Sequence, residues 1–274
     1  MCIRDRAYTR YLDLVDRREV LVPTSQGPAR VFLLRPKGMQ ANSPILINIH
    51  GGGFVRPHMP CNTYFCAKMA VEAGCLVADI DYKLAPEYPY PVAFHECYDV
   101  VRWVFDQSKT WGGDHNQVTL CGHSAGGSLT LSIAIRARLT GDFVLRRQII
   151  DFGAMDLVTD PAEKRGAEAS VLSVERMRAF NTLYTDDDPK VLYSPYVSAC
   201  CAPDELFLGL PETVILTAGK DPLRFEAEEL AGRLVAQGVR VMLQRFLNSN
   251  HGFTVHCTGD WEAAQALILD TLRS

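Results

Sequence analysis

The sequence lacks several features that would place the protein in a specialised class. No apolar run approaches the roughly 18 residues that a membrane-spanning helix needs. Basic residues are not in excess, since 28 Lys and Arg stand against 32 Asp and Glu for a formal net charge of −4, which argues against nucleic acid. The N-terminal residues contain no apolar core of a secretory signal. These absences predict a cytoplasmic protein with neither a membrane nor a nucleic acid as its partner.

Also missing is any C-x-x-C pair or N-x-S/T glycosylation sequon, although the chain has nine cysteines. Neither a zinc knuckle nor a redox pair is therefore indicated. Several of the cysteines lie in apolar runs, where a thiol acts as a small buried hydrophobe. A reducing compartment is the simplest explanation of this pattern.

What the sequence does contain is a regular alternation of strand and helix patterns along most of its 274 residues. With 47% hydrophobic and 22% charged residues, it can bury one large core. Such alternation predicts an α/β fold in which helices cover both faces of a mostly parallel sheet, with the first two strands as an antiparallel pair at its edge. The expected strands are residues 19–22, 29–34, 44–49, 75–80, 118–121, 148–152, 213–217 and 239–246, and the expected helices are residues 61–73, 93–105, 129–139, 225–236 and 261–272.

The alternation stops between residues 154 and 210. This stretch has a helical pattern over residues 174–183 and an acidic run at residues 186–188, which fits a solvated face. Apolar side chains such as Met177 and Phe180 give the stretch anchors for packing. Long insertions in α/β folds are usually functional lids, so we expect a helical cap here. The alternative is a surface excursion without a fixed structure.

Residues 117–132 read QVTLCGHSAGGSLTLS, in which Gly122–Gly126 fits the pattern G-x-S-x-G between a buried strand and a helix. This context predicts a nucleophile elbow that presents Ser124 on a sharp turn. Glycines at both ends of the motif avoid Cβ clashes in so tight a turn. Ala125 heads the helix, so its backbone N–H is free to bind an oxyanion. Taken alone, the motif fits a Gly/Ser turn before a core helix equally well.

An activated serine needs a general base and a carboxylate that orients the base. Asp221 directly follows the strand at residues 213–217, and His251 follows the strand at residues 239–246. Loops after parallel strands meet at one end of the sheet, so Ser124, Asp221 and His251 can converge there. Two alternatives remain open: Asp221 could be an N-cap for the next helix, and His256 could be the base.

The run His50-Gly51-Gly52-Gly53 follows the buried strand at residues 44–49. Consecutive glycines permit positive φ and let backbone N–H groups point at a ligand. We therefore expect the N–H groups of Gly52, Gly53 and Ala125 to form an oxyanion hole, with His50 supporting the loop through hydrogen bonds. A phosphate loop is disfavoured, because no Lys-Ser/Thr follows and the run is not G-x-G-x-x-G.

Five motifs in this order, HGGGF, DYKLAPEYPYP, GHSAGG, DPLR and HGF, resemble the hormone-sensitive-lipase-like branch of the α/β-hydrolases, the bacterial family IV carboxylesterases. The resemblance covers about residue 19 to the C-terminus. It implies the α/β-hydrolase fold with an eight-stranded, mostly parallel sheet, and hydrolysis of small acyl esters without metal or cofactor. Carried over by motif, Ser124 is the nucleophile, His251 the base and Asp221 the acid. The catalytic domain is then residues 19–274 with a cap insertion at residues 154–210, and residues 1–18 are a charged lead-in that corresponds to a truncated cap segment.

Two departures from the family pattern leave alternatives open. The family normally has a longer helical N-terminal segment that completes the cap, so here either the cap is partial or the chain is truncated. His123 stands where the family usually has Asp or Thr, and GHSAG also occurs in formamidase-like hydrolases, so amide or formamide substrates remain an alternative. Plant gibberellin receptors resemble this fold and bind a ligand without the catalytic histidine, whereas this chain keeps His251. A homodimer through the strand at residues 239–246 would suit the resemblance. The candidate substrate-binding residues are Phe54, His123, Leu223 and Phe253.

Overall fold

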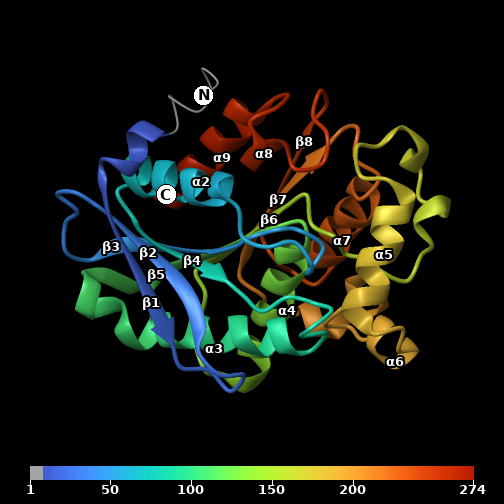
Figure 1. The fold of residues 1–274 in the computed structure, drawn as a ribbon, viewed down its shortest axis with the longest axis horizontal. Helices are drawn as coiled ribbons and strands as arrows, with labels where there is room; N and C mark the ends of the chain where they lie inside the picture. The colour runs from blue at the N-terminus through green and yellow to red at the C-terminus, as the bar shows by residue number, and fades with distance from the viewer. Residues whose placement is uncertain (1–8) are drawn as a thin grey trace.

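The computed structural model describes residues 9–274. Its strands form one sheet in the order β1-β2-β4-β3-β5-β6-β7-β8 (Figure 1). The strands are β1 (Val15–Val22), β2 (Ala29–Pro36), β3 (Ser43–Ile49), β4 (Leu76–Asp81), β5 (Gly113–His123), β6 (Arg147–Asp151), β7 (Glu212–Ala218) and β8 (Val241–Phe246). Strand β2 is antiparallel to both of its neighbours, β1 and β4, and all other pairs are parallel. The predicted fold, a mostly parallel eight-stranded sheet with an antiparallel edge, is confirmed.

Helices cover both faces of this sheet, as the alternation predicts. The helices are α2 (Pro60–Ala73), α3 (Val92–Gln107), α4 (Ala125–Thr140), α5 (Val174–Thr185), α6 (Pro189–Leu192), α7 (Arg224–Ala236), α8 (Phe253–His256) and α9 (Trp261–Arg273). Helices α2, α8 and α9 lie along one face, and α3 and α4 along the other (Figure 1). Two apolar cores fill the spaces between sheet and helices, one containing Phe65 and Ile268 and the other containing Val101, Ile133 and Leu230.

The first strand begins earlier than the sequence pattern predicts. Strand β1 starts at Val15, not at residue 19, and pairs with β2 along its whole length, from Val15 opposite Pro36 to Val22 opposite Ala29. Its charged residues 16–19 are exposed at the sheet edge, so they carry no apolar signal of a strand. Residues 9–12 are helical, and the first eight residues of the expected lead-in lie outside the described part of the chain.

Between β6 and β7, residues 154–210 form α5, α6 and several short 3₁₀ turns. Helix α5 begins with a side-chain cap, in which Ser173 Oγ accepts a hydrogen bond from the N–H of Arg176 at 3.3 Å. Tyr184 near its end is buried and stacks on Phe54, with ring centroids 3.6 Å apart. Helices α5 and α6 occupy one end of the molecule, on the side of α7 (Figure 1). The insertion is thus folded against the rest of the protein.

The parallel strands β3, β5, β6, β7 and β8 all point their carboxyl ends to the same edge of the sheet. This is the edge at which α/β folds usually bind ligands. It brings together the glycine loop after β3, the serine turn after β5 and the loops that carry Asp221 and His251. No described helix is both long and apolar enough to cross a lipid bilayer.

Candidate active site

Ser124 sits on a strained turn between β5 and α4, with φ 53° and ψ −116°. Residues other than glycine at positive φ cost on the order of 1–3 kcal/mol, and such strain persists only where the surroundings hold it. A Cβ on Gly122 would lie 2.0 Å from the carbonyl oxygen of Gly126, and a Cβ on Gly126 would lie 2.1 Å from that of Ile49. Both positions therefore require glycine, as expected for a nucleophile elbow.

Three side chains converge above this turn in one hydrogen-bonded chain. His251 Nε2 lies 2.9 Å from Ser124 Oγ, and His251 Nδ1 lies 2.7 Å from Asp221 Oδ2. Because a carboxylate only accepts, Nδ1 carries a proton and Nε2 is left to accept the proton of the serine hydroxyl. The second oxygen of Asp221 accepts the N–H of Leu223 at 3.1 Å, so this carboxylate is held from both sides.

The surroundings of His251 favour its charged form. Burial alone lowers the pKa of this imidazole, but the negative charges of Asp221, Asp151 and Glu226, together with the hydrogen bond to Asp221, raise it above its ordinary value. The competing histidine, His256, has no hydrogen bond to Ser124 or Asp221 within the described residues, and burial lowers its pKa. Of these two histidines, His251 is thus the one whose ring lies between Asp221 and Ser124.

The glycine loop after β3 leaves backbone donors free. Gly52 and Gly53 have φ values of 129° and 62°. In the described part of the chain, the N–H groups of Gly52, Gly53 and Ala125 donate to no other residue. His50 Nδ1 donates to the carbonyl of Gly51 at 2.7 Å, and because burial lowers the pKa of His50 to about 4, its ring is neutral at pH 7. Three unpaired donors beside Ser124 can hold a negatively charged oxygen.

Two cavities include Ser124 in their lining. The larger, about 270 Å³, is also lined by His251, Gly252 and His256. The smaller, about 40 Å³, does not include His251. Its apolar wall includes Phe54, Leu157, Leu172, Met177, Phe180 and Leu223, of which Leu157, Leu172, Met177 and Phe180 come from the insertion. The candidate substrate-binding residues Phe54 and Leu223 therefore lie beside the serine, in the smaller cavity.

The candidate Phe253 does not lie where the sequence interpretation places it. Its ring is fully buried in the apolar core, where it packs against Phe152 and Phe246 with centroids 5.9 and 5.3 Å away. It lines neither of the two cavities beside Ser124. The expectation that Phe253 contacts substrate is wrong, because the short helix α8 turns this side chain into the core while His251 faces the serine.

His123 is fixed by two polar partners beneath the elbow. Its Nδ1 lies 2.8 Å from Asp151 Oδ2, and its Nε2 lies 3.0 Å from Asn48 Oδ1. The amide orientation of Asn48 is set by Asp79, whose carboxylate accepts from Asn48 Nδ2 at 2.8 Å. Both ring nitrogens of His123 thus face side-chain oxygens. The ring touches the floor of the larger cavity but offers a substrate no hydrogen bond.

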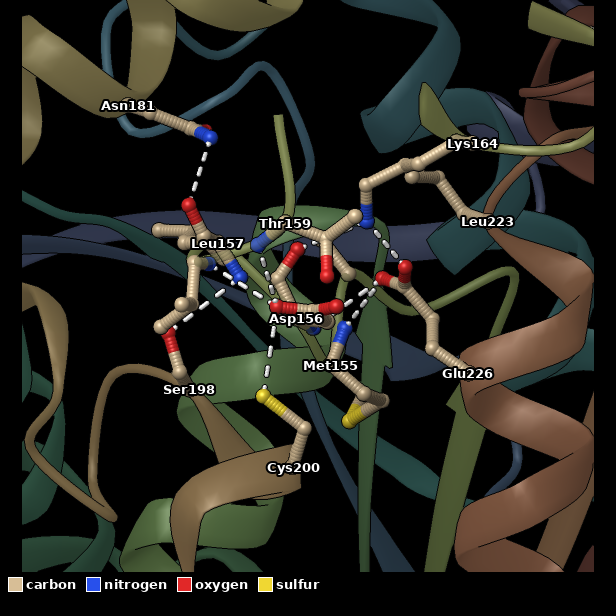
Figure 2. A network of polar contacts seen from close by, with 12 residues as sticks. Met155, Asp156, Leu157, Thr159, Lys164, Asn181, Ser198, Cys200, Leu223 and Glu226 are labelled. Atoms are coloured by element: carbon tan, nitrogen blue, oxygen red, sulfur yellow. Dashed lines mark hydrogen bonds and ion pairs between the residues drawn. The ribbon is translucent and has the colours of Figure 1, made fainter. Parts of the chain in front are cut away.

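A buried ion pair that the sequence does not indicate fastens the insertion to α7 (Figure 2). Glu226, five residues after Asp221, pairs with Lys164 of the insertion, and it also accepts from the N–H groups of Met155 (2.7 Å) and Asp156 (3.1 Å). Both side chains are nearly inaccessible, with 6% of Lys164 and 9% of Glu226 exposed. Burial raises the pKa of Glu226 to about 7, so the pair is fully ionised only above neutral pH.

Comparison with known proteins agrees with this geometry. A family model described as the α/β hydrolase fold matches residues 46–255. The chain belongs to this family, in the hormone-sensitive-lipase-like branch of carboxylesterases that the five motifs indicate.

Individual relatives support that assignment. The chain is similar to Esterase LipI of Mycobacterium tuberculosis, with 32% identity over 78% of this chain and 67% of that protein. It is also similar to the hormone-sensitive lipase of Bos taurus, with 35% identity over 43% of this chain and 16% of that protein. Among solved structures, the hyperthermophilic esterase of Pyrobaculum calidifontis superimposes with a TM-score of 0.88 at 29% identity, covering 99% of this chain and 92% of that one.

Proposed function

We propose that this protein hydrolyses short-chain acyl esters of small molecules, with Ser124 as nucleophile, His251 as general base and Asp221 as the carboxylate that orients it. The observation that carries the proposal is the unbroken hydrogen-bonded chain from Asp221 through His251 to Ser124, set on a strained elbow. Esterase LipI and the Pyrobaculum calidifontis protein are both named esterases, which favours an ester over an amide as substrate.

The reaction proceeds by two acyl transfers. Ser124 Oγ attacks the ester carbonyl while His251 Nε2 takes its proton, and the N–H groups of Gly52, Gly53 and Ala125 hold the oxyanion. As the tetrahedral intermediate collapses, His251 gives the proton to the leaving alcohol and the acyl group stays on Ser124. Water then attacks the acyl-enzyme with the same proton transfers, which releases the acid and restores the serine. Each oxyanion donor contributes about 3 kcal/mol of transition-state stabilisation.

The two cavities divide the substrate between them. The leaving oxygen must lie within reach of His251, so the alcohol occupies the larger cavity, which His251 lines. The acyl chain then enters the smaller cavity of about 40 Å³, where residues of the insertion act as a cap. A cavity needs about 10–15 Å³ to hold one water-sized group. The smaller cavity therefore has room for about three carbon-sized groups of the acyl chain beyond the carbonyl.

This volume predicts the acyl-length profile. We expect kcat/KM to be highest for the p-nitrophenyl esters from acetate to butyrate. For the octanoate it should be lower by about tenfold or by a larger factor, because longer chains must displace packed side chains. Met177→Ala removes part of the cavity wall and should shift the optimum toward longer chains. An unchanged profile in this variant would place the acyl group elsewhere. N-formyl-arylamines assayed in parallel test the amide alternative.

The raised pKa of His251 predicts the acid limb of the pH profile. The base must be neutral to take the serine proton, so activity is lost as pH falls through its pKa. We expect kcat/KM to rise with pH to a plateau, with a midpoint above the ordinary histidine value of about 6.5. Initial rates with p-nitrophenyl butyrate, measured from about pH 5 to about pH 9 in steps of about half a pH unit, define this limb. A midpoint below the ordinary value would contradict the environment described for His251.

A further inference from the structure

The smaller cavity beside Ser124 is not uniformly apolar. It begins at Ser124, and among its lining residues are three polar side chains, Asp156, Lys164 and Asn181. Burying a charge in an apolar pocket is costly unless the charge is paired and hydrogen-bonded. A cavity that only had to accept a hydrocarbon chain would not need a charged wall. The polar wall therefore points to a polar feature of the ligand.

Among residues 9–274, Lys164 is the one cationic residue in the lining of this cavity. Its ammonium group has three N–H donors. One is used by the ion pair with Glu226, and a second donates to the carbonyl of Asp156 at 2.7 Å (Figure 2). Within the described residues, the third N–H has no hydrogen-bond acceptor. A rigidly held ammonium with one open donor can bind an oxygen of a ligand in this cavity.

The charges around Lys164 define which kind of oxygen fits. Glu226 neutralises the ammonium, and Asp156 adds a further negative charge because hydrogen bonds, including those from Thr159, hold the pKa of its carboxyl below the usual range. Asp156 Oδ1 is itself occupied by the N–H groups of Val158 (2.8 Å) and Thr159 (3.0 Å). A carboxylate ligand would meet this net negative charge. A neutral acceptor, such as an ether, hydroxyl or keto oxygen, would not.

We propose that Lys164 is a specificity-determining residue that selects short acyl groups carrying a neutral hydrogen-bond acceptor beyond the carbonyl. The inference rests on the proposed function, in which the smaller cavity holds the acyl group. Its substrate class is esters of small alkoxy, hydroxy or keto acids. Glu226 and the carbonyl of Asp156 position the ammonium without contacting the substrate.

A matched pair of substrates isolates this contact. p-Nitrophenyl butyrate and p-nitrophenyl methoxyacetate differ only in one CH₂ that is replaced by an ether oxygen. Each kcat/KM is divided by the rate of hydroxide-catalysed hydrolysis of the same ester, which removes the difference in intrinsic reactivity. Assays at pH 8 keep Glu226 ionised. The wild-type protein should prefer the methoxyacetate by about tenfold, the size expected for one hydrogen bond to a charged donor.

Lys164→Met should bring this ratio close to one by losing activity on the methoxyacetate. Because that variant leaves Glu226 unpaired and buried, the double variant Lys164→Met with Glu226→Gln removes both charges together. Lys190→Met on the exposed surface of α6 is the matched control and should keep the wild-type ratio.

The outcomes separate this inference from the proposed function. A ratio that falls in both Lys164 variants but not in the control supports the inference. A wild-type ratio near one, or a ratio that both Lys164 variants leave unchanged, overturns it even if each ester is hydrolysed. Hydrolysis of neither ester by the wild-type protein would instead refute the proposed function.

Discussion

Ser124→Ala is expected to lower kcat for p-nitrophenyl butyrate by about 10⁵-fold or more, because the acyl-enzyme route is then closed. The serine Oγ lies within hydrogen-bond distance of His251 Nε2, at 2.9 Å. The residual ester hydrolysis by this variant should come from the free N–H groups of the oxyanion loop, which still polarise the ester carbonyl for direct attack by water.

The fold should survive this substitution, since the turn is fixed by its backbone. Ser124 N donates to the carbonyl of Asp151 at 2.9 Å, and Gly122 and Gly126 fit the close approach of neighbouring backbone. Thermal unfolding and the KM of residual turnover check that the variant is folded and still binds ester. A variant that keeps a tenth of wild-type turnover would exclude Ser124 as the nucleophile.

Asp221→Asn is expected to lower kcat by about 10⁴-fold while leaving KM nearly unchanged, as the corresponding change does in the serine-protease triad. The amide N–H would donate a hydrogen bond to His251 Nδ1, which forces the ring into the tautomer that carries its proton on Nε2. That nitrogen could then no longer accept the proton of Ser124. The amide oxygen can still accept the N–H of Leu223, so the loop itself keeps its shape.

The matched control for this variant is Asp187→Asn in the exposed acidic run of the insertion. Asp187 has φ 53°, a conformation that asparagine also tolerates, so the control makes the same chemical change far from His251. It should retain full activity. Comparable losses in the two variants would mean that Asp221 acts through stability, not through the histidine.

The parts of the site that the sequence predicts are those that follow easily recognised strands. Ser124, Asp221 and His251 each follow a strand that the sequence pattern predicts, and parallel strands must bring such loops to one edge. The glycine loop after β3 is predictable for the same reason. Fold, elbow and convergence of the three side chains thus follow from local patterns plus topology.

What the sequence could not predict depends on contacts between distant segments. Lys164 and Glu226 are 62 residues apart, and Lys164 lies in an insertion without regular periodicity, so nothing local indicates that the two pair. His123 contacts Asn48 and Asp151, which lie on the two strands beside its own. Only the sheet order reveals that these strands are neighbours. The sequence interpretation places Phe253 wrongly because a residue two positions after His251 can face either the cavity or the core, and the turn at α8 decides between them.

The most direct test of the account is to treat the protein with a serine-directed fluorophosphonate and map the adduct by peptide mass spectrometry. The account predicts one adduct per chain, on Ser124, with esterase activity lost in proportion to labelling and no labelling of Ser124→Ala. Complete loss of activity with the adduct on another residue, or undiminished hydrolysis by fully labelled protein, would contradict it.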